Sequence, residues 1–156
     1  MKKVWVFQSK REFSKDEISF INDNLHPFIT QWKAHGNELS ADFTLQDNRF
    51  IKVQVDEEME KASGCSIDSL TRKIKEIDNQ FQLGLLDRNL ISFIENNDIK
   101  TISLFDFKKE IKSGNISDET IFYNMAISNS DEFQTQFKIK IKDSWAKNLL
   151  AKEAKT

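Results

Sequence analysis

Two stripes of apolar residues with helical spacing, separated by two segments of strict alternation, constrain the fold of this chain more than any other feature. The first stripe consists of Ile18, Ile21, Leu25, Phe28, Ile29 and Trp32. The second stripe consists of Ile67, Leu70, Ile74, Ile77 and Phe81. Residues that recur at three and four positions share one face of a helix, so each stripe predicts an amphipathic helix. Residues 39–46 and 51–56 alternate apolar with polar side chains around Asp47 and Asn48, which predicts a β-hairpin.

Further strand signals flank these elements and indicate a topology. Residues 4–8 are rich in β-branched and aromatic side chains, which is typical of a strand. Residues 90–95 and 100–104 have the pattern of a second hairpin, joined at an Asn-Asn-Asp turn. The order of elements over residues 1–99 is therefore β-α-β-β-α-β, which is the order of a ferredoxin-like unit. We predict an α+β fold.

The remaining residues, 100–156, are expected to form a C-terminal α/β extension. No linker, repeat or low-complexity block separates them from residues 1–99, so we predict a single domain over residues 1–156. We expect the extension to pack on the sheet face that the two helices leave open. Its signals are a helix capped by Ser103, strands over 120–127 and 137–141, and a helix that begins at Trp145 after a cap at Asp143 or Ser144.

Local signals set the expected helix ends. Ser14 and Glu17 have the spacing of a capping box, which predicts a helix start. Pro27 lacks a backbone N–H, so we expect a kink or two shorter helices there. Three glycines follow helical segments and are expected to end them: Gly36, Gly84 and Gly114. Gly64 instead precedes the second apolar stripe.

Scarce residue types exclude several kinds of chemistry. The chain has four glycines, and neighbouring ones are at least 20 positions apart, which excludes a Walker A loop, a dinucleotide fingerprint and a GxSxG elbow. One cysteine permits neither an internal disulfide nor a cysteine-based zinc cluster. The two histidines have no metal-ligand spacing. We therefore predict no cofactor and no metal site.

The charge pattern bears on partners and location. A net charge of −2 and a pI of about 5.8 argue against nucleic acid as a partner. Six lysines stand against two acids from residue 138 onward, a basic C-terminal end that suits either an acidic partner or a solvated helix and tail. No apolar run approaches the ~18–20 residues of a membrane span, and the first eight residues do not form a signal peptide. We expect a cytoplasmic protein.

The first candidate site is the segment over residues 62–69, where a strand leads into the second helix. Backbone N–H groups and the positive dipole end face any ligand at such a start, and Cys65 would have its thiolate stabilised there. Asp68 opposes this, because its carboxylate already supplies negative charge. In the alternative interpretation, Ser63 or Ser66 caps the helix, Gly64 makes the turn and Cys65 is a small half-buried residue.

The second candidate is the segment Gln31-Trp32-Lys33-Ala34-His35-Gly36. A histidine at a helix C-terminus has its protonated form favoured, and His35 could serve Cys65 as a base if the two helix ends meet. The alternative is a histidine that caps the last helical carbonyls. Trp32 would line the same site.

Two further groups of residues are candidates for a binding surface. Trp5, Phe7, Arg49 and Phe50 could present aromatic and basic groups on the second sheet face, as RNA-recognition sheets do, but the strand motif of such domains is absent. Burial beneath the extension is the preferred interpretation of these rings. The adjacent pair Asp87-Arg88 either lines a cleft or forms a structural salt bridge.

Seven short motifs taken together resemble a known family. They are Val4-Trp5-Val6-Phe7-Gln8-Ser9, Gln31-Trp32-x-Ala34-His35-Gly36, Asn48-Arg49-Phe50, Val55-Asp56-Glu57, Ala62-Ser63-Gly64-Cys65-Ser66-Ile67-Asp68-Ser69, Asp87-Arg88 and Asp143-Ser144-Trp145. Over nearly its whole length the chain resembles a small family of uncharacterised bacterial proteins often labelled "ABC transporter ATPase". The resemblance implies no known activity or catalytic residues, and this chain has Ala146 where a histidine is expected. The label requires a Walker A loop that the chain lacks, so we do not predict ATP hydrolysis.

These observations lead to a hypothesis, an alternative and a third interpretation, which is a purely structural interaction protein with a basic C-terminal tail. The hypothesis is a ligand-binding or protein-interaction module whose site lies at the start of the second helix. Its binding residues would be Trp32, Arg49, Ser63, Gly64, Ser66, Asp68, Asp87 and Arg88. The alternative is a cysteine-dependent enzyme with Cys65 as nucleophile and His35 as base. The ligand or partner and the oligomeric state cannot be read from the chain.

Overall fold

The chain folds into two compact units, each with its own sheet and core. The computed structural model describes residues 1–154, and the side chains of residues 1–150. The first unit consists of Met1–Leu86 and Ser128–Asp131, and the second of Asp87–Ile127 and the described residues from Glu132 on. The mixture of helices and antiparallel sheets confirms the α+β class. The division falls after Leu86, whereas the sequence analysis placed the start of the extension at residue 100.

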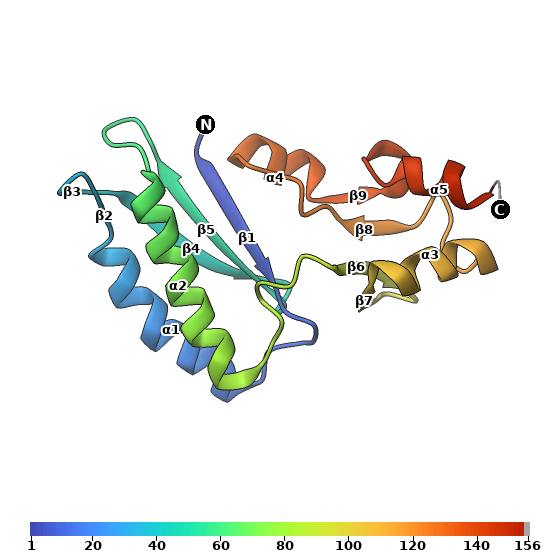
Figure 1. Ribbon diagram of the computed structural model, residues 1–156, viewed down its shortest axis with the longest axis horizontal. Helices are drawn as coiled ribbons and strands as arrows, with labels where there is room; N and C mark the ends of the chain where they lie inside the picture. Colours follow the sequence, from blue (N-terminus) through green and yellow to red (C-terminus); the bar gives the residue numbers. More distant parts are fainter. Residues whose placement is uncertain (155–156) are drawn as a thin grey trace. The chain divides into compact units, whose positions relative to one another are not determined.

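The first unit is a three-stranded antiparallel sheet covered on one face by two helices (Figure 1). The strand order is β1-β5-β4. The strands are β1 (Lys3–Gln8), β4 (Ser40–Gln46) and β5 (Phe50–Asp56), the helices are α1 (Lys15–Thr30) and α2 (Gly64–Phe81), and a small hairpin is formed by β2 (Lys33–Ala34) and β3 (Asn37–Glu38).

The core of the first unit joins the predicted helical stripes to β5. Its fully buried residues include Ile21, Leu25, Leu70, Ile74, Ile77, Ile51, Val53 and Val55. Burial of one such side chain contributes roughly 1.5–3 kcal/mol, so the two stripes hold the helices on the sheet. Trp5 and Phe7 pack against this core, on the helix-covered side of the sheet. The idea that they face the second side is therefore wrong.

The fourth strand position of the expected ferredoxin-like sheet is filled by a different segment. The segment expected there, β6 (Leu90–Glu95), belongs to the sheet of the second unit. The outer edge of β1 instead pairs with Ser128–Asp131, which we call the edge segment. Its contacts are hydrogen bonds from the Val4 N–H to the Ser128 carbonyl at 3.0 Å, from the Ser130 N–H to the Lys2 carbonyl at 2.8 Å and from the Lys2 N–H to Ser130 Oγ at 2.9 Å. The first unit therefore lacks a complete ferredoxin-like sheet.

The second unit is built around a four-stranded antiparallel sheet in the order β7-β6-β8-β9. Its elements besides β6 are β7 (Asp98–Ser103), α3 (Leu104–Ser113), β8 (Ile121–Tyr123), α4 (Ser130–Gln136, which begins in the edge segment), β9 (Lys138–Lys140), a 3₁₀ turn (Ile141–Asp143) and α5 (Lys147–Ala154). Phe93 pairs across the sheet with Phe122, and both rings are buried with Phe107 of α3. These aromatic residues give the second unit a core of its own. Whether the extension covers the first sheet stays a prediction.

Several predicted helix ends and turns are confirmed, but two glycines do not end helices as predicted: Gly36 does not end α1, and Gly84 does not end α2, which stops at Phe81 with Gln82 as its C-cap. Ser103 caps α3, and Gly114 ends it with φ +85°. α1 stops at Thr30. Gly36 lies with His35 in the turn between β2 and β3, where both residues have positive φ, as two-residue hairpin turns require. Pro27 does not divide α1 into two helices, because the helix runs unbroken from Lys15 to Thr30 with Pro27 in its last turn.

The start of α1 contains an ion pair that the sequence did not reveal. Ser14 and Glu17 form the predicted capping box. Arg11 adds two hydrogen bonds to the Glu17 carboxylate, at 2.6 and 2.5 Å. The hydrogen bond from Arg11 is the main reason that the pKa of Glu17 is lowered to about 2, and the Ser14 N–H contributes to the same effect. The nearly buried Glu17 is thus an ionised, fully bonded group that holds the helix start.

Candidate functional site

The predicted site at the start of α2 uses its serines to begin the helix. Ser63 is the N-cap, and its Oγ accepts the Ser66 N–H at 3.1 Å. Ser66 Oγ accepts the Ser63 N–H and donates to the Ser63 carbonyl, both at 2.7 Å. The alternative interpretation expected Ser63 or Ser66 to cap the helix, and in the structure both do. Their hydroxyl groups are therefore engaged within the fold.

Trp32 has a structural role at the same place. Its ring is almost completely buried, and its indole Nε1 donates to the Ser66 carbonyl at 2.8 Å. The ring also makes an edge contact with Trp5 at a centroid distance of 5.8 Å. This hydrogen bond ties the segment after α1 to the first turn of α2 and leaves the polar group of Trp32 satisfied.

Cys65 and His35 both lie at this end of the first unit, and both are exposed. The exposure of Cys65 contradicts the half-buried position in the alternative interpretation. His35 lies in the β2–β3 turn rather than at the end of α1, so the helix dipole argument for its protonation does not apply. Asn37 of β3 donates to Glu60 Oε2 at 3.1 Å, which ties the hairpin to the connector before α2. Within residues 1–150, no hydrogen bond joins His35 to Cys65.

Of the other predicted binding residues, Gly64 and Asp68 belong to the start of α2, Arg49 lies apart from it, and Asp87 and Arg88 belong to the second unit. Arg49 directly precedes β5, and α2 begins beyond the opposite end of that strand, about 20 Å away for seven extended residues. Asp87 and Arg88 are exposed residues of the second unit. The Asp87 carboxylate accepts the Asn89 N–H at 2.9 Å, which shapes a turn. Gly64 and Asp68 are exposed in the first turns of α2.

The basic C-terminal end is partly neutralised. Glu119 forms ion pairs with Lys140 at 2.8 Å and Lys142 at 2.5 Å. The hydrogen bonds from these two lysines lower the pKa of Glu119 to about 2. Lys155 and the side chain of Lys152 lie outside the described residues. Two of the lysines that made this end basic in sequence therefore already have an acidic partner.

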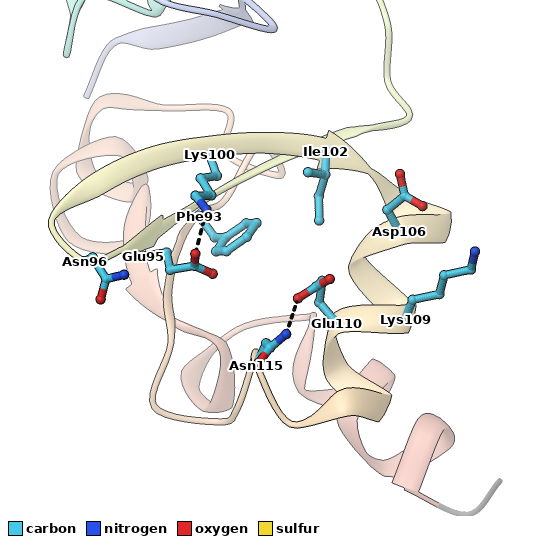
Figure 2. Close-up of a pocket in the computed structure, with 9 residues that line it drawn as sticks. All are labelled: Phe93, Glu95, Asn96, Lys100, Ile102, Asp106, Lys109, Glu110 and Asn115. Atoms are coloured by element: carbon cyan, nitrogen blue, oxygen red, sulfur yellow. Dashed lines mark hydrogen bonds and ion pairs between the residues drawn. The ribbon is translucent and has the colours of Figure 1, made fainter.

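The second unit contains a hollow of about 710 Å³ between the β6–β7 hairpin and α3, shown in Figure 2. Its volume falls within the usual range of ligand sites, roughly 300–1,000 Å³. The lining residues are Phe93, Glu95, Asn96, Lys100, Ile102, Asp106, Lys109, Glu110 and Asn115. None of them belongs to the site predicted from the sequence.

The pairing of β6 with β7 explains the strand side of the hollow. Phe93 is opposite Lys100, and alternate residues of a strand point to the same face. Glu95 and Ile102 therefore share the face of Phe93 and Lys100. The part of this face near the start of α3 packs in the core of the second unit. The part near the β6–β7 turn, with Glu95 and Lys100, is not covered and forms the wall of the hollow.

The helix side of the hollow follows from helical spacing. α3 begins directly after β7 with Ser103 as its cap, so its first turns stay close to the hairpin. Asp106, Lys109 and Glu110 are three and four positions apart and lie on one side of the helix. Asn115, just beyond the helix, donates to Glu110 Oε2 at 2.8 Å. Figure 2 shows the Glu110 carboxylate directed toward the hollow and Lys109 extending away from it.

The charges in the hollow are unevenly balanced. Lys100 Nζ binds Glu95 Oε1 at 2.6 Å. The pKa of Lys100 is raised, mainly by this hydrogen bond and by the charge of Glu95, with smaller contributions from Glu110 and Asp98. Lys109 Nζ lies 4.4 Å from the centre of the exposed Phe105 ring. The hollow thus combines an apolar floor of Phe93 and Ile102 with three carboxylates and one inward ammonium group.

Sequence reasoning missed this hollow, although one signal pointed to it. Glu95 and Lys100 place charges where the hairpin pattern otherwise continues an apolar face, and the spacing of Asp106 and Glu110 puts two acids on one side of α3. A charged end on an otherwise apolar face indicates that the core stops there.

No family model, curated protein or solved structure matches the chain. In the described part of the chain, no helix is long and apolar enough to cross a membrane. Over the same residues, no group of three or more His, Cys, Asp or Glu side chains is arranged to hold a metal ion. The assignment of a function therefore depends on the geometry of the two candidate regions.

Proposed function

We propose that this protein is a ligand-binding module whose site is the hollow of the second unit. The observation that carries this proposal is the combination of an apolar floor with charged and amide side chains around a hollow of ligand size. Apolar area supplies binding free energy, and a few polar groups fix the orientation of a ligand. The proposal keeps the class of function predicted from the sequence and places the site elsewhere.

The start of α2 is a weaker candidate for this function because the fold uses its polar groups. Ser63, Ser66 and Trp32 are bonded to one another or to the helix backbone. A ligand would have to break these bonds to gain new ones, so little net binding free energy would result. Glu110 of the hollow, in contrast, can accept further hydrogen bonds on its second oxygen.

A fragment screen observed by NMR tests this proposal. Uniformly ¹⁵N-labelled protein is titrated with mixtures of small fragments, and amide shifts are recorded for the whole chain. We expect binders to shift amides of β6, β7 and α3. The proposal is wrong if fragments shift amides around residues 63–69 and none shifts those of the hollow. A variant with Ile102 replaced by Lys should lose the binding, and Gln134→Lys, at an exposed position outside the hollow, is its control.

A cysteine-dependent enzyme remains the second candidate, because Cys65 is exposed in the first turn of an 18-residue helix with an exposed histidine at the same end of the unit. The test is the rate of Cys65 alkylation by iodoacetamide between pH 5 and 9. A thiol that reacts rapidly below pH 7 and slows on His35→Ala supports the enzyme. An ordinary thiol profile, unchanged by His35→Ala, rejects it.

A further inference from the structure

The acidic groups of the hollow differ in what already binds them. Glu95 is paired with the ammonium group of Lys100. One carboxylate oxygen of Glu110 accepts a hydrogen bond from the neutral side-chain amide of Asn115. In the described part of the chain, no cation is paired with Glu110 or Asp106. Two carboxylates around the hollow are thus left without a bound cation.

The second lysine of the hollow does not compensate for these acids. The Lys109 ammonium lies over the exposed ring of Phe105, 4.4 Å from the ring centre. Figure 2 shows its chain directed away from the centre of the hollow. Since Lys100 is paired with Glu95, the Glu110 carboxylate that Figure 2 shows directed toward the hollow leaves a net negative charge above an apolar floor.

We propose that the hollow selects an organic cation, an alkylammonium or alkylguanidinium whose hydrocarbon part lies on Phe93 and Ile102 while its N–H groups bind Glu110. This inference rests on the proposed function and adds the class of ligand. A guanidinium group matches carboxylates well, because its N–H donors form a planar fork. An anion of similar length would meet uncompensated carboxylates, so the same groups exclude it.

Agmatine, a butyl chain with a guanidinium at one end and an ammonium at the other, is a suitable probe. Hexanoate and 1-pentanol serve as the anionic and neutral comparisons. Titrations of the full chain, observed by ¹⁵N amide shifts, should show agmatine in the hollow with a Kd on the order of 1 mM, which is typical of a small ligand with few contacts. Hexanoate should not shift the amides of β6, β7 and α3, and pentanol should shift them more weakly than agmatine.

Two substitutions of opposite sign test the charge argument. Glu110→Gln keeps the acceptor for Asn115 but removes the charge, and should weaken agmatine binding about fivefold, as expected for a partly exposed ion pair. Lys100→Gln removes the resident cation, frees Glu95 and should tighten binding by a similar factor. Asp118→Asn, which removes an exposed carboxylate outside the hollow, is the matched control and should leave the Kd unchanged.

The outcomes separate this inference from the proposed function. If hexanoate or pentanol binds the hollow as tightly as agmatine, or if Lys100→Gln weakens agmatine binding, the cation preference is wrong while the ligand site stands. If no probe and no fragment shifts the amides of the hollow, the proposed function fails as well. A well-dispersed amide spectrum for each variant verifies that it is folded.

Discussion

The start of α2 and the hollow beside α3 show opposite uses of polar side chains. At the start of α2, the polar groups of Ser63, Ser66 and Trp32 are bonded within the fold. In the hollow, the partly exposed Glu110 is bonded only to the Asn115 amide, and its carboxylate is directed toward the open space. Residues that are conspicuous in sequence can thus be needed for folding, while a binding surface can be formed by ordinary charged residues. The following predictions test this contrast through stability.

The largest effect is expected at Trp32. Trp32→Ala should lower the free energy of unfolding by about 3–5 kcal/mol, because it leaves a large cavity and removes the indole hydrogen bond to the Ser66 carbonyl. Trp32→Phe, which keeps the ring but loses the indole N–H, should cost about 1–2 kcal/mol. Urea unfolding followed by Trp5 fluorescence in a Trp145→Phe background measures both. A loss below 1 kcal/mol for Trp32→Ala would show that Trp32 is not structural.

The next effect concerns Glu17, the fully bonded carboxylate of α1. Its folded pKa of about 2 is below the ordinary value of 4.5, so its stabilisation is present above pH 4.5 and is lost as the pH falls toward 2. Glu17→Gln should lower the free energy of unfolding at pH 7 by about 1–2 kcal/mol. Arg11 is half-exposed, so solvent screening keeps this loss small. The same substitution should flatten the pH dependence of stability between pH 2 and 4.5. Glu76→Gln, at an exposed ion pair with Lys73, is the control and should change neither.

Ser63 gives a smaller effect at the predicted site itself. Ser63→Ala removes the N-cap acceptor of α2 and should lower stability by about 1 kcal/mol. Ser69→Ala, in the same helix but outside the cap, should change stability by less than about 0.5 kcal/mol. Equal effects of the two substitutions in urea unfolding would contradict a capping role for Ser63.

The smallest change in stability is expected in the hollow. Glu110→Gln should change the thermal unfolding free energy by less than about 0.5 kcal/mol, because Glu110 is partly exposed and Gln retains the bond from Asn115. A loss of more than 1 kcal/mol, measured by circular dichroism, would assign Glu110 to the stability of the second unit and remove the contrast between the two regions.

Periodicity in the sequence predicted the elements well but could not assign their partners. The spacing of Leu70, Ile74 and Ile77 marks a helix face, and Asp47-Asn48 marks a turn, because both signals are local. The same apolar alternation in β6 suits an edge position beside β1 or a central position beside β8. Tertiary packing decides between them, and the Phe93–Phe122 pairing shows the result. The hollow was missed for the same reason, since it depends on where the core of the second unit ends.

The edge segment on β1 has a consequence for the synthesis of this protein. Residues 1–86 emerge from the ribosome before residues 87–131 and contain the three strands and both helices of the first unit. The segment that covers the outer edge of β1 emerges only after all of residues 87–127. During that interval β1 presents unpaired N–H and carbonyl groups, which can pair with the same strand of a neighbouring nascent chain. Slowing translation between residues 87 and 127 lengthens this interval, so the rate of elongation over the second unit influences how much of the first unit folds correctly.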